Sequence, residues 1–387
     1  MANIIGTKTT GLIEQHRLVI DMEDTIHLLD PNANPFLVLT SLVGKGKGRD
    51  TIFNPEFKWM EDDYVGTYTT LAQDANANAT DLIVTDSSIF KPNDIITSTN
   101  TSNCDYMLIT SINRTNNTLT VVRRIAGETT APAIQQGALI VRITDAFKEG
   151  AAKGDIISTQ TTQLENYTQI IRTAFGVTGT LDATKLYGGA DLGYQRKKAG
   201  IEHAIKIERA MLFGRKGKLD GTTEPRRFMK GLYYFIQTNV TDLAGNSLTE
   251  IAFEEFLESG FMYGNETKYL LCAPKIISQI NLWARGKLRL VPGEKTYGLA
   301  VMEYLSAHGH LYLVNCKKVF NIAPWDSMAI LVDIDKVKPV VLRPTKLRTN
   351  IQNPDEDKEI DEYIGEYSIK VYNEKCHALL TNVGPVA

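Results

Sequence analysis

Residues Asp191 to Gly214, with the sequence DLGYQRKKAGIEHAIKIERAMLFG, form the stretch that decides the fold. Apolar side chains recur in it at spacings of three, four and seven residues, which places them along one side of a helix. The side predicted to be buried consists of Ile201, Ala204, Ile205, Met211 and Leu212. The opposite side consists of Gln195, Lys198, Glu202, Lys206 and Arg209. The pattern predicts a long amphipathic helix of roughly 36 Å, at a rise of 1.5 Å per residue.

The ends of this helix carry conventional start and stop signals. Asp191 is expected to cap the first turn, and Gly214, followed by basic residues, is typical of a C-terminal stop. Ile205 is predicted to lie at the centre of the apolar stripe. Because an amphipathic helix of this kind occurs in many folds, the flanking segments decide what it means.

The bulk properties of the chain limit the classes of protein to which it can belong. With 387 residues, the chain is long enough for two or three domains. A net charge of −3 and a pI near 6.1 argue against a dedicated DNA-binding protein. The four cysteines are far apart in sequence, which predicts neither a zinc site nor a disulfide framework. We find no secretory signal and no apolar run near the roughly 20 residues that cross a bilayer, and so expect a soluble protein made in the cytosol.

Residues 1–49 are poorly suited to a compact domain and are expected to form an arm. Val19 to Leu29 is predicted to form a few helical turns, and Phe36 to Val43 a strand. The sequence GKGKGRD, which follows at 44–50, has the glycine spacing of a phosphate-binding loop. No helix pattern follows it and its third glycine is misplaced, so a flexible basic hinge is favoured over a phosphate site.

An acidic cluster follows the arm. Phe53, Phe57 and Trp59 precede three adjacent carboxylates, Glu61, Asp62 and Asp63. Such a cluster could bind a divalent cation, but consecutive strand residues point to opposite faces. A solvated patch, or a partner for basic residues on another chain, is favoured.

A region rich in Asn, Thr, Ser, Val and Ile spans about 76–143. Short strands separated by turn residues are predicted at Asp81–Thr85, Asp94–Ser98, Tyr106–Ile112, Thr118–Arg124 and Ala138–Ile143. Strands at this regular spacing predict a small antiparallel barrel or sandwich inserted into the fold, with an open meander as the alternative.

Mixed helices and strands follow this region. Thr159 to Phe175 is expected to contain a helix and a strand, Phe228 to Gln237 a buried strand, and Asp361 to Leu380 a hairpin. Alternating strands and helices between Glu250 and Ile334 predict an α/β or α+β domain. A basic cluster after the long helix could touch phosphates or pair with a neighbouring chain; it consists of Arg215, Lys216, Lys218, Arg226 and Arg227.

No complete catalytic or metal-binding motif is present in the sequence. His308 and His310 near Cys316 could place two imidazoles on one face for zinc, although a polar loop is the favoured reading. Asp333 and Asp335 could do acid–base work, but the solvent face of a strand predicts the same pattern. Residues 293–296, GEKT, match only the tail of a nucleotide-binding loop. We therefore expect no enzyme activity, no cofactor and no metal.

Several segments, in their order along the chain, resemble the major capsid proteins of tailed bacteriophages with the HK97-type fold. The resemblance is strongest to the SU10-like subfamily, which carries an inserted β-domain. The segments are DMEDTIHLLDPNANPF (21–36), FKWMEDD (57–63), IERAMLFGRKG (207–217), RRFMKGLYYFI (226–236), APWDSMAILVDIDKVK (323–338), and LRPT (342–345) with DEYIGEYSIKVYNEKCHALLTNV (361–383).

The resemblance implies an α+β capsid fold with five regions. They are an N-terminal arm at 1–49, an extended E-loop at 50–160 carrying the β-insertion at about 76–143, a peripheral domain at 161–236 with the spine helix at 191–214, an axial domain at 237–335, and a return to the peripheral domain at 336–387. Residues expected at contacts between subunits are Lys45, Lys47, Arg49, Trp59, Glu61, Asp62, Asp63, Arg215, Lys216, Arg226 and Arg227.

The resemblance also implies function and partners. The chain is expected to assemble with itself, as hexamers and pentamers, into an icosahedral virion capsid around double-stranded DNA, which it contacts without sequence specificity. A portal protein, and possible scaffolding and decoration proteins, are the other implied partners; no membrane is implied. Assembly is expected in the host bacterial cytoplasm. The alternatives are an encapsulin-like bacterial compartment and a cytosolic α/β enzyme with a β-barrel appendage.

Overall fold

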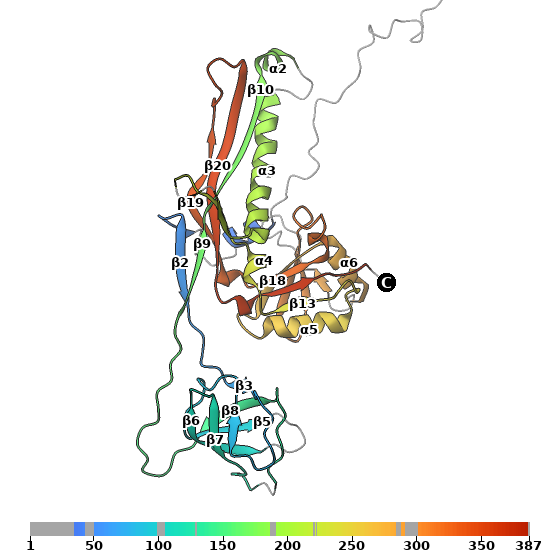
Figure 1. Ribbon diagram of the computed structural model, residues 1–387. Helices are drawn as coiled ribbons and strands as arrows, with labels where there is room; N and C mark the ends of the chain where they lie inside the picture. Colours follow the sequence, from blue (N-terminus) through green and yellow to red (C-terminus); the bar gives the residue numbers. More distant parts are fainter. Residues whose placement is uncertain are drawn as a thin grey trace, which may run out of the picture. The chain divides into compact units, whose positions relative to one another are not determined.

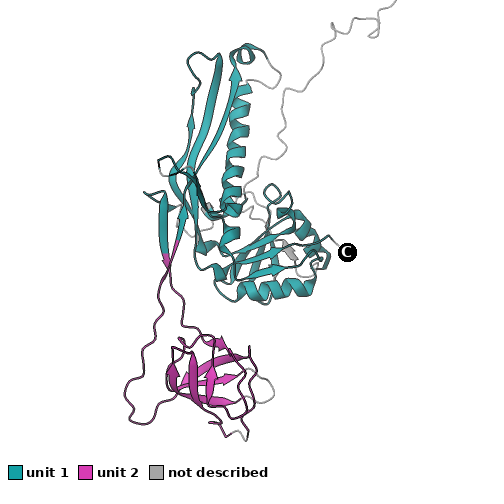
Figure 2. Cartoon of the chain, in the orientation of Figure 1, with its two compact units in different colours: residues 1–59, 165–387 teal, residues 60–164 magenta. Residues whose placement is uncertain are grey.

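The computed structural model describes residues 35–42, 50–98, 105–127, 130–185, 191–219, 221, 223–283, 288–290 and 301–385. The chain divides into two compact units, shown in Figures 1 and 2. Unit 1 combines residues 1–59 with 165–387, and unit 2 consists of residues 60–164. The chain passes into unit 2 along β2 (Glu56–Glu61) and returns along β9 (Thr162–Tyr167); these two strands pair as a separate sheet.

Unit 2 contains a closed antiparallel barrel. Its strands follow the order β3-β8-β5-β6-β7-β4, with bounds β3 (Tyr68–Thr70), β4 (Asp81–Ile83), β5 (Asp94–Ser98), β6 (Tyr106–Asn113), β7 (Thr118–Val122) and β8 (Leu139–Asp145). The two edges meet at an antiparallel bridge between Leu71 and Val84, where Thr85 N–H also donates to the Thr70 carbonyl over 2.9 Å. The predicted barrel is therefore confirmed, and an open meander is excluded for this unit.

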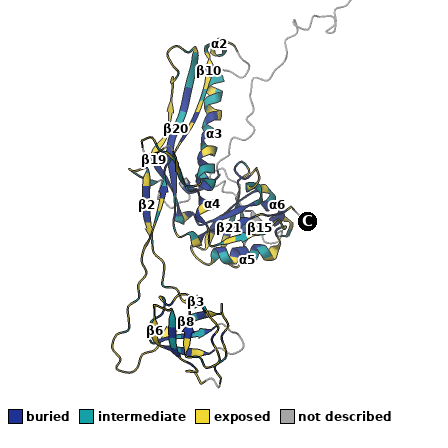
Figure 3. Cartoon of the chain, in the orientation of Figure 1, coloured by how far each residue is buried: buried dark blue, intermediate teal, exposed yellow. Residues whose placement is uncertain are grey.

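Buried and exposed residues alternate along the strands, and the buried ones form a core inside the barrel. Inward positions are fully buried, as in the run Met107 and Ile109 of β6, while the residues between them face outward. Figure 3 shows buried and exposed residues alternating on these strands. All five predicted strands overlap observed ones, but β3 was missed because it precedes the compositional change at residue 76.

The long helix of unit 1, α3 (Asp191–Phe213), lies along a four-stranded sheet (Figure 1). The sheet has the order β1-β19-β20-β10, with β1 (Asp50–Thr51), β19 (Val337–Arg348), β20 (Lys358–Val371) and β10 (Gln169–Thr178). The short α2 (Gly179–Ala183) follows β10 directly, and β11 (Gly217–Leu219) pairs with β12 (Arg226–Phe228) just after α3. The helix has the predicted extent, although Asp191 is its first residue rather than a preceding cap.

A second, mixed sheet of unit 1 has seven strands. Their order is β13 (Val240–Asp242), β21 (Ala378–Thr381), β18 (Ala329–Val332), β14 (Thr267–Cys272), β17 (His310–Asn315), β16 (Val301–Leu305) and β15 (Leu288–Leu290). The helices α5 (Glu250–Phe261) and α6 (Pro274–Trp283) pack on it through a shared apolar core that includes Phe253, Phe256 and Ile280. The predicted α+β class is confirmed.

Some local predictions are wrong. Phe36 to Val43 was predicted as a strand, but Pro35–Leu42 forms the helix α1, which begins at a proline, a residue favoured in the first helical turn. In the predicted buried strand Phe228–Gln237, β12 ends at Phe228 and α4 (Leu232–Phe235) follows. Thr159–Phe175 contains β9 and the start of β10 but no helix. The predicted helix Val19–Leu29 lies outside the described residues.

The predicted hairpin at Asp361–Leu380 is also wrong. β20 pairs with β10 and β19 in one sheet, whereas β21 pairs with β13 and β18 in the other. Asn373 separates them with a left-handed backbone, at φ 48°, and the short 3-10 helix Glu374–Cys376 follows. This segment therefore connects the two sheets of unit 1.

Candidate functional site

The buried face of α3 joins the helix to its sheet, and it differs from the predicted stripe. The buried residues are Ala199, His203, Ile207, Glu208, Met211 and Leu212. Met211 and Leu212 were predicted correctly, but Ile201, Ala204 and Ile205 are only half-buried. The buried row advances by four residues, from 199 through 203 and 207 to 211. Two of the six buried residues, His203 and Glu208, are polar, and a search for apolar periodicity alone therefore placed the predicted face away from Ile207.

His203 connects α3 to two strands. Its Nδ1 lies 3.2 Å from Thr173 Oγ1 of β10, and its Nε2 lies 3.3 Å from Thr345 Oγ1 of β19. Burial lowers the pKa of this imidazole, and the nearby Lys206 ammonium lowers it further. Lys206, predicted on the solvent side, is exposed but also donates to Thr173 Oγ1 over 3.0 Å. The polar positions of α3 therefore contribute to packing as well as the apolar ones.

Glu208 connects α3 to the helix α1. Its side chain is fully buried and accepts hydrogen bonds from the backbone N–H groups of Phe36 (3.3 Å) and Leu37 (3.4 Å). These are donors of the first helical turn, which have no partner within the helix. Burial raises the pKa of Glu208 to about 8, against the lowering effect of the two hydrogen bonds. A single acidic side chain thus holds a segment more than 170 positions earlier in the chain.

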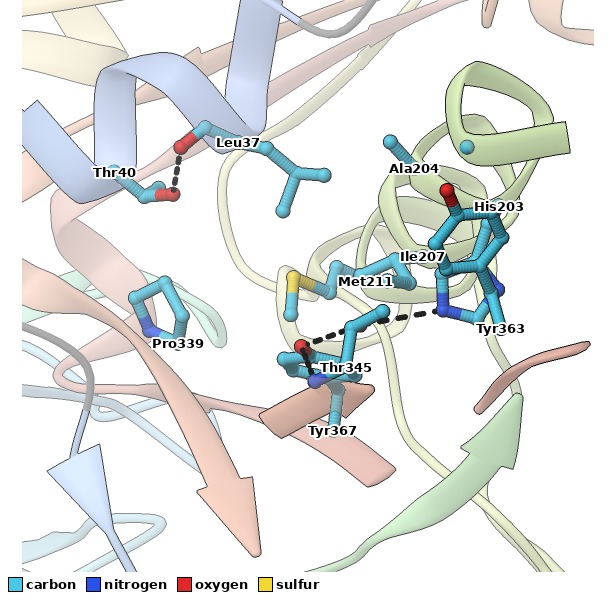
Figure 4. A pocket seen from close by; sticks show the side chains of 11 residues that line it. Leu37, Thr40, His203, Ala204, Ile207, Met211, Pro339, Thr345, Tyr363 and Tyr367 are labelled. Atoms are coloured by element: carbon cyan, nitrogen blue, oxygen red, sulfur yellow. Dashed lines mark hydrogen bonds between the residues drawn. The ribbon is translucent and has the colours of Figure 1, made fainter. Parts of the chain in front are cut away.

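A cavity of about 220 Å³ lies where α1, α3, β19 and β20 meet (Figure 4). Its walls are mostly apolar, with Leu37, Met211 and Pro339 facing it, and Tyr363 and Tyr367 on the sheet side. Its polar groups satisfy one another: the Tyr367 hydroxyl lies 2.7 Å from both the backbone nitrogen and Oγ1 of Thr345. The hydroxyl groups of Thr345 and Tyr367 and the His203 imidazole bond to one another between the helix and the sheet, so we interpret the cavity as a packing feature of this junction.

The predicted contact residues of the arm cannot be placed, because Lys45, Lys47 and Arg49 lie outside the described residues. The prediction that Trp59 contacts another subunit is contradicted by its burial within its own subunit. The residue is only 8% exposed, and its ring stacks on Phe57 at 5.9 Å and also lies 5.9 Å from the ring of Phe235. The indole therefore belongs to the interior of unit 1.

The acidic cluster lies at the start of unit 2. Asp62 and Asp63 are exposed and Glu61 is half-buried. Asp62 accepts a hydrogen bond from Thr159 Oγ1 over 2.8 Å. No group of three or more His, Cys, Asp or Glu side chains in the described part of the chain is arranged to hold a metal ion. A contact of this cluster with another subunit stays a prediction.

The basic cluster is largely paired within its own subunit. Lys216 Nζ lies 2.5 Å from Glu165, and Lys218 Nζ lies 3.1 Å from Glu56. Arg227 is 3.8 Å from the same Glu56 carboxylate. These pairs argue against Lys216 and Arg227 as free cations for a phosphate or a neighbouring chain. Arg215 and Arg226 are exposed and stay predictions.

The remaining candidates for chemistry have structural explanations. His308 lies 3.8 Å from Glu254, and His310 lies 3.1 Å from Glu303, whereas Cys316 is fully buried. Asp333 is not on a solvent face as expected; it is 1% exposed and accepts hydrogen bonds from Asn265. The GEKT segment at 293–296 lies outside the described residues. In the described ranges, no helix combines the length and apolar character that a membrane span requires.

The sequence profile of the SU10 major capsid proteins matches residues 4–384, nearly the whole chain. The chain belongs to the SU10 major capsid protein family. The major capsid protein of Pseudomonas phage PaMx41 is 23% identical over 353 residues, which cover 87% of this chain and 82% of that protein.

Two solved structures are similar to this SU10 family member in fold. A structure of Mycobacterium phage Adephagia is 9% identical, covers 99% of each chain and has a TM-score of 0.48. The capsid of a native GTA particle is 7% identical, covers 98% of this chain and 99% of that one, and has a TM-score of 0.49. The family assignment rests on the sequence profile.

The family settles the main alternatives of the sequence analysis. This SU10 family member is a phage major capsid protein with the HK97-type fold, as the resemblance implied. The encapsulin-like compartment and the cytosolic enzyme are not favoured. Its role is structural, and proteins of this kind assemble with themselves into the shell of the virion.

Proposed function

We propose that this chain forms hexamers and pentamers that close into the icosahedral head of a tailed phage and enclose its double-stranded DNA. The observation that carries this proposal is the family match over residues 4–384. The charge of the chain is compatible with it. A net charge of −3 gives the shell little electrostatic affinity for DNA, so packaged DNA is contained without being gripped by basic residues.

The regions of the chain are proposed to have the following roles in the shell. Residues 1–49 form the N-terminal arm, 50–160 the E-loop region with the barrel, 161–236 the peripheral domain, 237–335 the axial domain, and 336–387 the return to the peripheral domain. Supporting this division, α3 and three of the four strands of its sheet (β10, β19 and β20) come from the third and fifth regions, and the six strands of the barrel come from the second. The junction of α1 with Glu208 would attach the end of the arm to the spine helix.

Contacts between subunits are proposed to use exposed charged side chains of opposite sign. Asp62 and Asp63 on one copy and Arg215 and Arg226 on another are the candidates, because all four are exposed. A portal protein at one vertex, and scaffolding and decoration proteins, are the proposed further partners. Assembly is proposed to occur in the host bacterial cytoplasm, and the chain is proposed to have no enzymatic turnover.

Electron microscopy of the purified chain, expressed alone and with the other head proteins of its phage, tests the proposal. We expect closed shells or free capsomers, and no turnover in a general hydrolase and transferase screen. A protein that stays a monodisperse monomer at high concentration, in infected cells as well as in vitro, would contradict the proposed function.

A further inference from the structure

One side of the barrel presents an apolar surface, although outward strand positions of a solvated sheet are usually polar. Six outward side chains define it: Tyr68, Ile95, Leu108, Val122, Val141 and Ile143. We call this set the apolar barrel face. Tyr68 is 60% exposed, Val122 50% and Ile143 49%.

The strand register makes this face continuous. Val141 of β8 pairs with Tyr68 of β3, and Ile95 of β5 pairs with Leu108 of β6. Leu108 pairs in turn with Val122 of β7. Directly paired residues on one face of a sheet lie about 5 Å apart, so these side chains touch their neighbours. Between β8 and β5 the register pairs Val141 with Thr97 and Thr144 with Ile95, so Val141 and Ile95 are diagonal neighbours there, a separation that large side chains still bridge. The face therefore extends across five adjacent strands, with threonines beside the apolar residues at the β8–β5 step.

Charged side chains are absent from the middle of this patch. Among the outward residues of β3, β5, β6 and β8, only Asp145, at the end of β8, is charged, and Lys91 Nζ neutralises it at 2.9 Å. The outward residues of β4 and β7 outside the patch include Asp81 and Thr120, which bond to each other.

The absence of charge indicates what can cover the face. A strand of DNA, or a partner that binds through its charge, would find no complementary group there. Across a two-fold axis each surface meets a copy of itself, so any net charge would repel its own image; an uncharged apolar face avoids this cost. A second copy of the same face therefore fits it, and a shell supplies such copies at high effective concentration.

We propose that the barrels of two subunits pack against each other through the apolar barrel face, related by a two-fold axis. This inference rests on the proposed assembly of the chain into shells. The patch is small for a stable dimer, since specific interfaces bury roughly 800 Å² per partner. The contact consequently forms between subunits that the rest of the shell already holds in place, and it strengthens the particle.

Cross-linking in assembled particles tests the contact directly. Val141→Cys, near the middle of the face, is compared with Ile156→Cys, which lies outside the barrel strands of unit 2 and is 85% exposed in the native chain. Both variants carry Cys104→Ser; the other native cysteines, Cys272, Cys316 and Cys376, are buried. Particles are treated with a short bismaleimide and the products separated on a denaturing gel.

We expect at least about fivefold more subunit dimer from Val141→Cys than from Ile156→Cys, because facing thiols react at high effective concentration. Equal yields in intact particles would overturn the proposal, as would a cross-link from Val141→Cys to a different polypeptide. Wild-type particles are prepared in parallel. If they fail to form, the proposed function fails; if they form but Val141→Cys gives no excess dimer, only the barrel contact is rejected.

A charge-pair measurement gives an independent result. Ile143→Lys and Ile143→Glu alone each place like charges across the axis and should lower the urea concentration that dissociates the particle. Particles assembled from both variants together should recover toward wild type, because unlike charges then meet. Ile156→Lys, the control, should behave as wild type. Failure of the mixture to recover, with barrels folded by circular dichroism, contradicts a two-fold contact.

Discussion

The backbone N–H of Phe36 donates a 3.3 Å hydrogen bond to the buried carboxyl group of Glu208. Phe36 itself is fully buried, so the first turn of α1 and the middle of α3 share one enclosed polar contact. A carboxylate at a helix N-terminus gains from the exposed N–H groups there. Burial without a cationic partner works against ionisation, and it raises the pKa of Glu208 to about 8. The contact therefore responds to pH.

Glu208→Gln should remove a pH-dependent loss of stability. Because the pKa of Glu208 is about 8 in the folded chain and the ordinary pKa of a glutamate is 4.5, the unfolded chain loses the proton first as pH rises. Stability from the protonated group is fully present below about pH 4.5 and declines until about pH 8, by about 1.4 kcal/mol per pH unit. We expect the glutamine variant to lack this decline in urea unfolding of unassembled subunits between pH 5 and 8.

The matched control is Glu202→Gln, an exposed carboxylate on the same helix. At each pH, the free energy of unfolding of the wild type is subtracted from that of the variant. This difference removes the contributions of His203 and of other groups that titrate in the same range. If Glu208→Gln keeps the full pH dependence of the wild-type chain, the carboxyl group of Glu208 is not the titrating group and the proposed linkage is wrong.

A second prediction concerns the register of α3. Ile207 is 5% exposed and lies on the cavity wall, whereas Ile205 is half-buried. Ile207→Ala should lower the free energy of unfolding by about 2–5 kcal/mol, the range for truncating a buried aliphatic side chain. Ile205→Ala should cost less than half as much. Urea unfolding of both variants checks the order, and equal losses would favour the stripe centred on Ile205.

The extent of α3 could be predicted because its signal is local, but its orientation could not. Apolar residues recur at helical spacing through most of the segment, and the observed helix ends at Phe213, one residue from the predicted stop. The buried face includes His203 and Glu208, whose partners come from β10, β19 and α1. A polar side chain is buried only when distant segments satisfy it, and a single helix sequence does not contain that information.

The same reason explains the other errors. The segment Phe36–Leu42 is apolar without a clear period, so a short strand and a short helix fit it equally well. Its helical form is fixed by contacts with α3. Asn373 is an ordinary turn residue in sequence, and only the pairing of β20 and β21 with different sheets shows that the chain crosses between them there. Trp59, taken for a surface contact, is enclosed by aromatic rings from residues 57, 235 and 372.

A third prediction tests the buried ion pair of the barrel. Arg123 Nε is hydrogen-bonded to Asp105, and their side chains are only 4% and 0% exposed. Asp105 also accepts from the backbone N–H of Arg124 over 2.9 Å. Asp105→Ala would leave a buried guanidinium without its carboxylate, a change that typically costs about 3–5 kcal/mol. We expect hydrogen exchange to accelerate in β6 and β7.

Asp81→Ala is the matched control for that measurement, since Asp81 is exposed and accepts a single hydrogen bond from Thr120. It should change the stability of the barrel by no more than about 0.5 kcal/mol. Unchanged exchange rates in the Asp105→Ala barrel would show that the pair contributes nothing to its stability.

The last prediction concerns the boundaries of the barrel. Its first and last strands are antiparallel neighbours, and Arg142 N–H donates to the Thr67 carbonyl over 2.7 Å. A few Gly-Ser residues can therefore replace residues 68–145 without strain, because domain ends that lie close together tolerate such excision. The apolar core of the seven-stranded sheet, and α3 with its four-stranded sheet, lie outside the removed segment, so unit 1 should stay folded by circular dichroism and resist proteolysis. Excising 76–143, the segment suggested by composition, should behave differently. It leaves β3 without a partner strand and its buried residue Thr69 uncovered, and an unpaired strand edge promotes aggregation.

Equal solubility of the two deletions would show that β3 does not belong to the barrel as a folding unit, whereas loss of both proteins would show that unit 1 depends on the barrel for its own stability.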